Sequence, residues 1–144
     1  MRLNAFTDFG LRVLTRLAGD PDRDFATRDL ARDFAVSQHH LNKVVTSLSK
    51  AGYVTTRRGR GGGLRLARPA GEIRLGDVVR DLEQGVALVE CFRADGGACT
   101  LTLNCRLITP LKAAQASFLQ ELNRVTLADA AYRVGGEIPL LHKR

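Results

Sequence analysis

Apolar residues recur every three or four positions along much of the chain, and this spacing predicts amphipathic α-helices. The first predicted helix begins at Thr7, has Asp8 in its first turn and ends at Gly19. One face of this helix carries the apolar residues Val13, Leu14 and Leu17. We therefore expect the helix to pack against the rest of the chain along that face.

Two shorter helices are predicted next, separated by a break at Ala35 and Val36. We expect Thr27 to cap the first and Ser37 to cap the second, because hydroxyl oxygens accept hydrogen bonds from the backbone N–H groups of a first turn. Gly52 is expected to end the second helix. Two helices joined by a tight turn predict a helix-turn-helix. Its inward-facing residues are Leu30, Ala31, Phe34, Leu41, Val44, Val45 and Leu48.

A β-hairpin is predicted directly after the helix-turn-helix. Residues 53–56 and 64–66 favour two strands, and the glycines between them favour a turn. Arginines lie within and beside this hairpin. A helix-turn-helix followed by a basic hairpin indicates a winged helix.

The second half of the chain predicts a short helix over 76–83, a polar loop and a long helix from about Arg106. The apolar stripe of the long helix is larger than one small winged helix can cover, so we expect a homodimer formed along it. Thr126 and Asp129 predict a capping box that opens a last short helix. The stripe consists of Leu107, Leu111, Ala114, Phe118 and Leu122.

The fold class predicted from these elements is mainly α. We expect a winged helix-turn-helix with a small β-hairpin wing and a long C-terminal dimerisation helix. The predicted parts are a DNA-binding domain over 1–83, a cysteine-bearing loop over 84–105, and the dimerisation helix with the C-terminal tail over 106–144. A chain of 144 residues is long enough for one compact domain with an extended appendage.

The charge of the chain favours a polyanionic partner. Twenty-two Lys and Arg residues against 15 Asp and Glu residues give a net charge of +7. A membrane surface would also attract a basic protein, but the arginines concentrate between residues 57 and 68, where no acidic residue occurs. We therefore expect double-stranded DNA as the partner. A twofold dimer would bind a palindromic operator with half-sites ~34–36 Å apart or a multiple of that.

The helix after Ser37 exposes polar side chains that can bind base edges and phosphates. Arginines of the wing can enter a narrow minor groove, where the negative potential is enhanced. A polar helix face that simply contacts water is the plainer interpretation, and the basic wing beside it favours DNA contact. The predicted DNA-binding residues are Gln38, His39, His40, Asn42, Lys43, Arg57, Arg58 and Arg60.

All three cysteines, Cys91, Cys99 and Cys105, lie in one window of the sequence. The chain shows neither the apolar start of a signal peptide nor a run near the ~20 apolar residues of a membrane span, so we expect a cytoplasmic protein. Thiols stay reduced there, and clustered cysteines favour a metal over disulfides. Three thiolates leave an iron–sulfur cluster or a zinc ion one ligand short. The alternative is three ordinary cysteines in a polar loop.

Asp8 is a candidate for the missing ligand. It also has a simpler interpretation, because the helix dipole stabilises a carboxylate in a first turn. His39 and His40 lie far in the sequence from the cysteines, so we expect them on DNA or at the surface rather than on a metal.

Several segments of the chain together resemble the Rrf-type winged-helix regulators, the family that includes IscR, NsrR and RirA. The resemblance covers nearly the whole length, and its first and last segments are most similar to the nitric-oxide-sensitive NsrR group. It is carried by the three cysteines and by residues 6–12 (FTDFGLR), 36–43 (VSQHHLNK), 50–54 (KAGYV), 58–66 (RGRGGGLRL), 73–83 (IRLGDVVRDLE) and 117–129 (SFLQELNRVTLAD).

The resemblance implies a repressor that binds a 4Fe–4S cluster, with 2Fe–2S as the alternative, through its three cysteines. It further implies that Asp8 of the partner subunit supplies the fourth ligand. IscR-type proteins are similar but use a histidine shortly after the third cysteine, and residues 106–108 contain none. Seven residues separate Cys91 from Cys99 and five separate Cys99 from Cys105, which is closer to the iron-responsive RirA.

These observations leave several hypotheses about function. The first is a repressor that senses nitric oxide through its cluster, and the alternatives in the same class are an iron-responsive or a cluster-status regulator. A more remote alternative is a zinc-stabilised interaction module. An enzyme is not expected, because the sequence has no dinucleotide-binding glycine pattern, no phosphate loop and no Ser–His–Asp arrangement.

Overall fold

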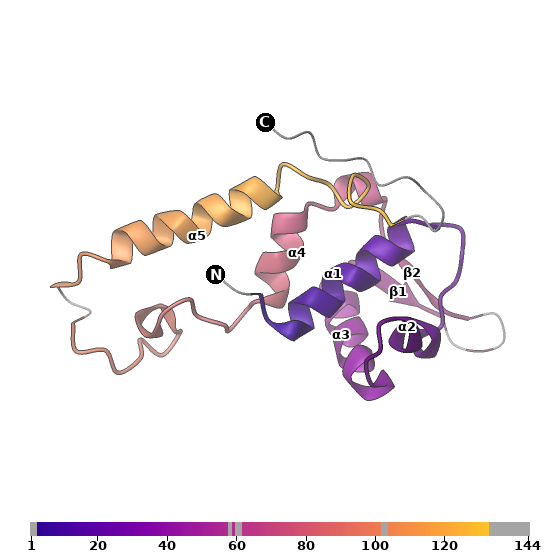
Figure 1. The fold of residues 1–144 in the computed structure, drawn as a ribbon, viewed down its shortest axis with the longest axis horizontal. Helices are drawn as coiled ribbons and strands as arrows, with labels where there is room; N and C mark the ends of the chain where they lie inside the picture. The colour runs from indigo at the N-terminus through magenta and orange to yellow at the C-terminus, as the bar shows by residue number, and fades with distance from the viewer. Residues whose placement is uncertain (1–2, 58, 60–61, 102–103, 133–144) are drawn as a thin grey trace.

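The computed structural model describes residues 3–57, 59, 62–101 and 104–132, and this part of the chain is mainly α-helical. A two-stranded hairpin follows the third helix, which confirms the predicted fold class. Helix α5 projects beyond the other helices, and the loop before it runs along the same side (Figure 1). The elements are α1 (Ala5–Ala18), α2 (Thr27–Asp33), α3 (Gln38–Lys50), β1 (Val54–Thr56), β2 (Leu64–Leu66), α4 (Leu75–Leu82) and α5 (Ile108–Leu122), with 3₁₀ turns at Ala70–Glu72 and Glu90–Phe92.

Capping residues set where the first three helices begin. Asn4 caps α1, and its side-chain oxygen accepts from the Thr7 N–H at 2.8 Å, so the predicted start at Thr7 was two residues late. The prediction for Thr27 was also wrong by one residue, because Ala26 holds the cap position and has no side-chain oxygen to offer. Ser37 caps α3 as predicted, with its hydroxyl accepting from the His40 N–H at 3.2 Å.

The two turns of the helix-turn-helix region use left-handed backbone. Ala35 has a φ of 53° between α2 and α3, and the Val36 N–H then donates back to the Ala31 carbonyl at 2.9 Å. Gly52 has a φ of 76° after α3, as expected for a glycine that ends a helix. These turns direct α3 across α2 and then lead the chain into the wing.

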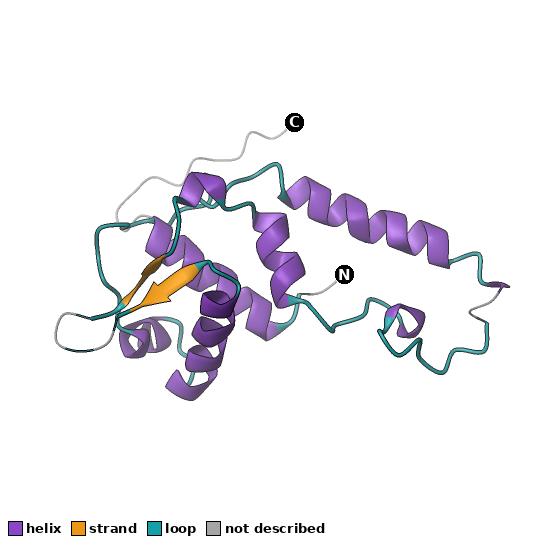
Figure 2. Ribbon diagram, turned by 180° about the vertical axis from the view of Figure 1, so that it is seen from behind, coloured by secondary structure: helices purple, strands orange, loops and turns teal. Residues whose placement is uncertain are grey.

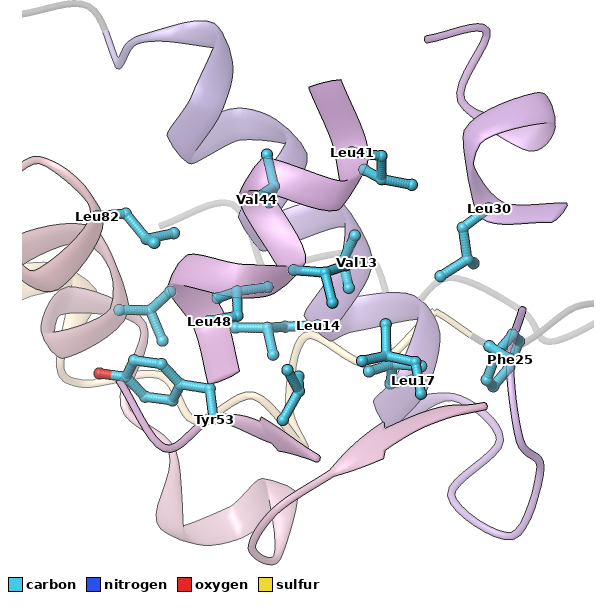
Figure 3. Packing of buried hydrophobic residues seen from close by; sticks show 14 of the residues in the cluster. Val13, Leu14, Leu17, Phe25, Leu30, Leu41, Val44, Leu48, Tyr53 and Leu82 are labelled. Atoms are coloured by element: carbon cyan, nitrogen blue, oxygen red, sulfur yellow. The ribbon is translucent and has the colours of Figure 1, made fainter. Parts of the chain in front are cut away.

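The core lies where α1, α3 and α4 meet the hairpin, and the buried side chains point toward one another there (Figure 3). The predicted inward residues of α3 are all buried, as are Leu30 and Ala31 of α2. Gly10 lets α1 approach α4 closely, since a Cβ at this position would collide with Leu82. Buried leucine and valine side chains each stabilise the fold by about 1.5–3 kcal/mol.

The wing is a short antiparallel hairpin in which Val54 pairs with Leu66 and Thr56 with Leu64 (Figure 2). Phe25 adds a bridge to Leu64 from the segment between α1 and α2. Arg65 fastens this edge, donating from Nε to Asp24 Oδ1 at 2.5 Å and from Nη2 to Asp24 Oδ2 at 3.0 Å. The hydrogen-bonded guanidinium holds the pKa of Asp24 below its usual value.

Helix α4 receives the C-terminal end of α5 at Gly76, where any side chain would collide with the Leu119 carbonyl. Next to this contact, Asn123 Oδ1 accepts from the Asp77 N–H at 2.9 Å, and Asn123 Nδ2 donates to Asp77 Oδ1 at 3.2 Å. No residue of α5 is buried. The long helix is therefore joined to the winged helix near its C-terminal end, and no residue of its predicted apolar stripe is fully buried in the single chain.

The segment after α5 returns to the core. Thr126 and Asp129 make the reciprocal hydrogen bonds of a capping box, at 2.9 and 3.2 Å. The short helix expected after them is absent from the described residues, which form turns up to position 130. Leu127 is fully buried, and its N–H donates to the Ile73 carbonyl at 2.8 Å. This packing explains why the box closes a turn rather than opening a helix.

None of the helices in the described part of the chain is both long and apolar enough to cross a membrane.

We expect Leu127→Ala to lower the free energy of unfolding by about 2–5 kcal/mol, because it leaves a cavity in the core. Leu101→Ala is the matched control, since Leu101 is 70% exposed and its loss should change stability by less than about 0.5 kcal/mol. Urea unfolding of both apoproteins measures the difference. Equal stability of the two variants would mean that the segment after α5 does not stabilise the winged helix.

Candidate DNA interface and cysteine loop

The exposed face of α3 carries four of the predicted DNA-binding residues. Gln38, His39, Asn42 and Lys43 are all exposed, and the N-terminal end of the helix presents the backbone N–H groups that favour a phosphate. The opposite face is buried through Leu41 and Val44. The arrangement leaves amide, imidazole and ammonium groups together on one surface, where they can contact base edges and phosphates.

His40 is only partly exposed, unlike the four residues above. Its ring makes edge contacts with Phe9 at 5.5 Å and with Phe6 at 6.3 Å, both on α1. Its Nε2 atom is buried without a hydrogen-bond partner in the described structure. His40 stands four residues before the buried Val44, and this spacing places both on the same side of α3. His40 is therefore half-buried rather than fully exposed, and its i, i+4 spacing to Val44 was the available signal for this. Its predicted contact with DNA stays a prediction.

Among the described arginines of the wing region, some contact other side chains of the protein. Arg57 is exposed, and its N–H donates to the Gly63 carbonyl at 2.9 Å where the strands separate. Arg65 is engaged by Asp24, and the Arg68 guanidinium lies 4.9 Å from the centre of the Tyr53 ring. The predicted DNA contacts Arg58 and Arg60 lie outside the described residues.

The three cysteines lie on the loop over 84–105, here called the cysteine loop, and none of them is fully buried. Cys91 belongs to the 3₁₀ turn and borders a hollow shared with α5 residues Lys112 and Gln115. Cys105 stands just before α5. The cysteine loop contains no buried residue among those the structure describes, so its conformation depends on local hydrogen bonds rather than on a core.

The donor chemistry of this loop fits an iron–sulfur cluster or zinc, since three thiols occur together with no competing histidine in the loop. Within the described part of the chain, however, no three Cys, His, Asp or Glu side chains gather in a way that could hold a metal ion. A single chain in this conformation thus supplies the donors without assembling them.

Asp8 is available in the first turn of α1 but is paired. Its Oδ2 lies 2.8 Å from Arg12 Nη2, and about half of each side chain is exposed. This is an i, i+4 ion pair on a helix surface, which stabilises a protein by only about 0.3–0.5 kcal/mol. The single chain does not bring Asp8 into a metal-binding group with the cysteines. Its carboxylate therefore serves the helix here, and little energy holds it in that pair.

Sequence reasoning missed two residues that shape the site. Glu90, next to Cys91, accepts a hydrogen bond from the Ala98 N–H at 3.1 Å across the cysteine loop. Asn123 joins α5 to α4 through Asp77. An exposed glutamate beside a cysteine gives no sequence signal for such a contact. The asparagine immediately after a long helix was the available sign of a polar joint.

Comparison with known proteins agrees with this geometry. A family model described as "Rrf2: Iron-dependent Transcriptional regulator" matches residues 3–133. The HTH-type transcriptional regulator NsrR of Geobacillus kaustophilus is 46% identical over 130 residues, which cover 90% of this chain and 88% of the relative.

Solved structures show the same fold. The oxidised form of Staphylococcus aureus CymR has a TM-score of 0.70 at 24% identity, covering 93% of this chain and 98% of its own. T. potens IscR has a TM-score of 0.68 at 24% identity, covering 90% and 85%. With the family match over nearly the whole chain, we conclude that this protein belongs to the Rrf2 family and is a transcriptional regulator rather than an enzyme.

Proposed function

We propose that this regulator is a DNA-binding repressor whose affinity for its operator depends on an iron–sulfur cluster that nitric oxide attacks. The observation that carries the proposal is the position of the three cysteines. They lie on the cysteine loop between α4, which packs on the winged helix, and α5, whose apolar stripe has no fully buried residue. The 46% identity to a relative named NsrR supports nitric oxide as the signal.

The proposal assigns one task to each part of the chain. Residues 1–83 bind DNA, residues 84–105 bind the cluster, and residues 106–144 dimerise, with Leu127 of this last part also packed in the core of the first. In a homodimer, two copies of α3 would face a palindromic operator. Exposed apolar side chains at the start of α5, such as Leu107 at 65% exposure, support an interface with a second copy.

Cys91, Cys99 and Cys105 would hold the cluster, with 4Fe–4S favoured and 2Fe–2S as the alternative. A bound cluster supplies a redox-active group that nitric oxide can destroy. Asp8 of the partner subunit would be the fourth ligand, which requires it to leave the exposed pair with Arg12. Because that pair is weak, its loss costs little against the new bond to iron.

The DNA contacts proposed are Gln38, His39, Asn42 and Lys43 from α3 and Arg57 from the wing, all exposed. Arg58 and Arg60 remain proposed contacts on the basis of the sequence. Arg65 is left out because Asp24 occupies its guanidinium. His40 is left out as well, because it is half-buried against α1 and its Nε2 atom is buried.

An iron-level sensor is the second candidate. The seven-residue and five-residue gaps between the cysteines favour it, as does the family description as iron-dependent. Titration of the loaded protein with nitric oxide, in parallel with iron chelation, separates the two signals. The two treatments are compared by the fraction of cluster lost when the protein leaves its DNA. The treatment that needs the smaller loss is the signal.

We expect Cys91→Ala, Cys99→Ala and Cys105→Ala each to lose stable cluster binding while the protein stays folded, because the loop has no buried residue to lose among those the structure describes. Iron, sulfide and visible absorption are measured after anaerobic purification, with unfolding of the apoproteins as the control. Zinc in a colourless wild-type protein would contradict the cluster and favour the zinc-stabilised module. Normal iron in one variant would remove that cysteine from the ligand set.

Operator binding should weaken steeply with salt. A dimer with about 6–10 phosphate contacts loses roughly 10³–10⁵ in affinity between 50 and 200 mM salt. Lys43→Ala should weaken binding and reduce the slope of log affinity against log salt by about 1 for each phosphate that is no longer neutralised. Arg124→Ala removes the same charge from the C-terminal side of α5 and should leave the slope unchanged. The measurement is a salt titration on an operator fragment selected from genomic DNA, and identical slopes would exclude α3 as the phosphate-binding surface.

Asp8→Ala should leave a cluster that forms but decays faster in air, because one iron loses its protein ligand. The melting temperature of the apoprotein should change little, since a first-turn carboxylate stabilises a helix by only about 0.3–1 kcal/mol. Mixing Asp8→Ala with Cys99→Ala subunits tests the arrangement across the dimer. Heterodimers with one intact site should hold half of the normal amount of stable cluster, whereas wild-type decay in Asp8→Ala itself would exclude Asp8 as a ligand.

A further inference from the structure

Two of the proposed cluster ligands are preceded by residues that contact each other directly. Glu90 stands before Cys91 and Ala98 stands before Cys99. The Glu90 carboxylate accepts from the Ala98 N–H through Oε1 at 3.1 Å, across eight residues of chain. This bond links the residue before Cys91 to the backbone just before Cys99.

A second contact joins the residue before Cys91 to the segment before Cys99. Gly97 has a φ of 62°, and a Cβ at this position would lie 2.6 Å from both the Glu90 carbonyl oxygen and its Cγ atom. Gly97 therefore lies against Glu90 with no room for a side chain. Gly96 also has left-handed backbone, with a φ of 79°, but a Cβ there would have no heavy atom within 4 Å. Of these two glycines, Gly97 alone combines the turn with the contact.

The turn between these ends is braced by a third group of bonds. Arg93 donates from Nε to Asp95 Oδ1 at 3.0 Å and from Nη2 to Asp95 Oδ2 at 2.6 Å. Asp95 Oδ1 also accepts from the Gly97 N–H at 3.0 Å. The hydrogen bond from the Arg93 guanidinium, and to a smaller extent that from the Gly97 N–H, holds the pKa of Asp95 below its usual value. The Asp95 carboxylate therefore stays charged at neutral pH.

We infer that Glu90 is a positioning residue that presets the separation of Cys91 and Cys99 for a shared metal centre. The inference rests on the proposed function for the identity of that centre. Glu90 acts through its hydrogen bond to the backbone before Cys99 and through its contact with Gly97, without touching the metal itself. Groups in this position orient the ligands, and their loss commonly costs about 10–100-fold in metal affinity.

Substitutions at Glu90 separate positioning from ligation. Glu90→Gln keeps an acceptor oxygen for the Ala98 N–H and should retain the cluster, whereas Glu90→Ala removes the acceptor and should speed cluster loss in air by about tenfold or more. Gly97→Ala should act like Glu90→Ala, and Gly96→Ala is its matched control. Glu121→Ala, which removes an exposed carboxylate on α5, controls for charge.

A second readout needs no cluster. Phenylarsine oxide bridges two nearby thiols, forming two arsenic–sulfur bonds and releasing water. In apoprotein carrying Cys105→Ala, only Cys91 and Cys99 remain to be bridged, and intact mass reports the product. Glu90→Ala and Gly97→Ala should weaken this capture by about tenfold, and Glu90→Gln and Gly96→Ala should not.

The outcomes divide clearly. The expected pattern in both assays supports positioning. If wild-type protein binds no cluster but the capture pattern holds, the proposed function fails and the positioning of the two cysteines stands. If Glu90→Gln loses the cluster as completely as Glu90→Ala while capture is unchanged, Glu90 is a ligand and the inference is overturned. Equal behaviour of all variants in both assays overturns it too.

Discussion

Helix α4 packs between α1 and α5 through two close contacts at glycines, and the position of α5 relative to the winged helix depends on them. Gly10 admits Leu82 on one side, and Gly76 admits the Leu119 carbonyl on the other. A methyl group at Gly76 would meet backbone and force the two helices apart, whereas one at Gly10 would require the Leu82 side chain to shift in a core with little room to relax. The position of α5 relative to the helix-turn-helix is thus set by two close approaches to one short helix.

The two sides of α4 differ in how they are stabilised. Toward α1, α4 contributes buried apolar side chains such as Val78 and Leu82 to the main core. Toward α5, the joint is partly polar and is made by Asn123 and Asp77. Apolar burial of this kind outweighs a few partly exposed hydrogen bonds, each of which contributes about 0.5–1.5 kcal/mol. The contacts within the winged helix are therefore more stable than those with α5. Helix α5 is attached to the winged helix through the C-terminal end of α5.

Local chemistry made most of the fold predictable. The 3–4 spacing on α3, the Ser37 cap and Gly52 placed that helix correctly, because each signal acts within one turn. The predictions were wrong where a helix start or a turn depended on residues outside the local pattern. Helix α1 begins before the predicted Thr7 because the amide oxygen of Asn4 caps it. The Thr126–Asp129 box closes a turn because Leu127 is held in the core by its hydrogen bond to Ile73.

The candidate site was less predictable for the same reason. His40 belongs to the polar letters of α3, yet the Phe6 and Phe9 rings of α1 cover it, and no pattern within α3 contains that information beyond its spacing to Val44. The cysteines were identified by residue type alone. In the described chain they do not form a group that could hold a metal ion, and no pattern within the loop indicates how they would come together.

Rearranging the cysteine loop requires less free energy than disturbing the core of the winged helix. A tenfold change in DNA affinity needs a difference of only about 1.4 kcal/mol between two states. The cysteine loop has no buried residue among those described, so changes of this size can occur within it through a few hydrogen bonds and ion pairs. Losing one buried leucine of the winged helix costs about 2–5 kcal/mol. A rearrangement of the cysteine loop can therefore leave the winged helix folded, and the loop leads directly into α5, in which no described residue is fully buried.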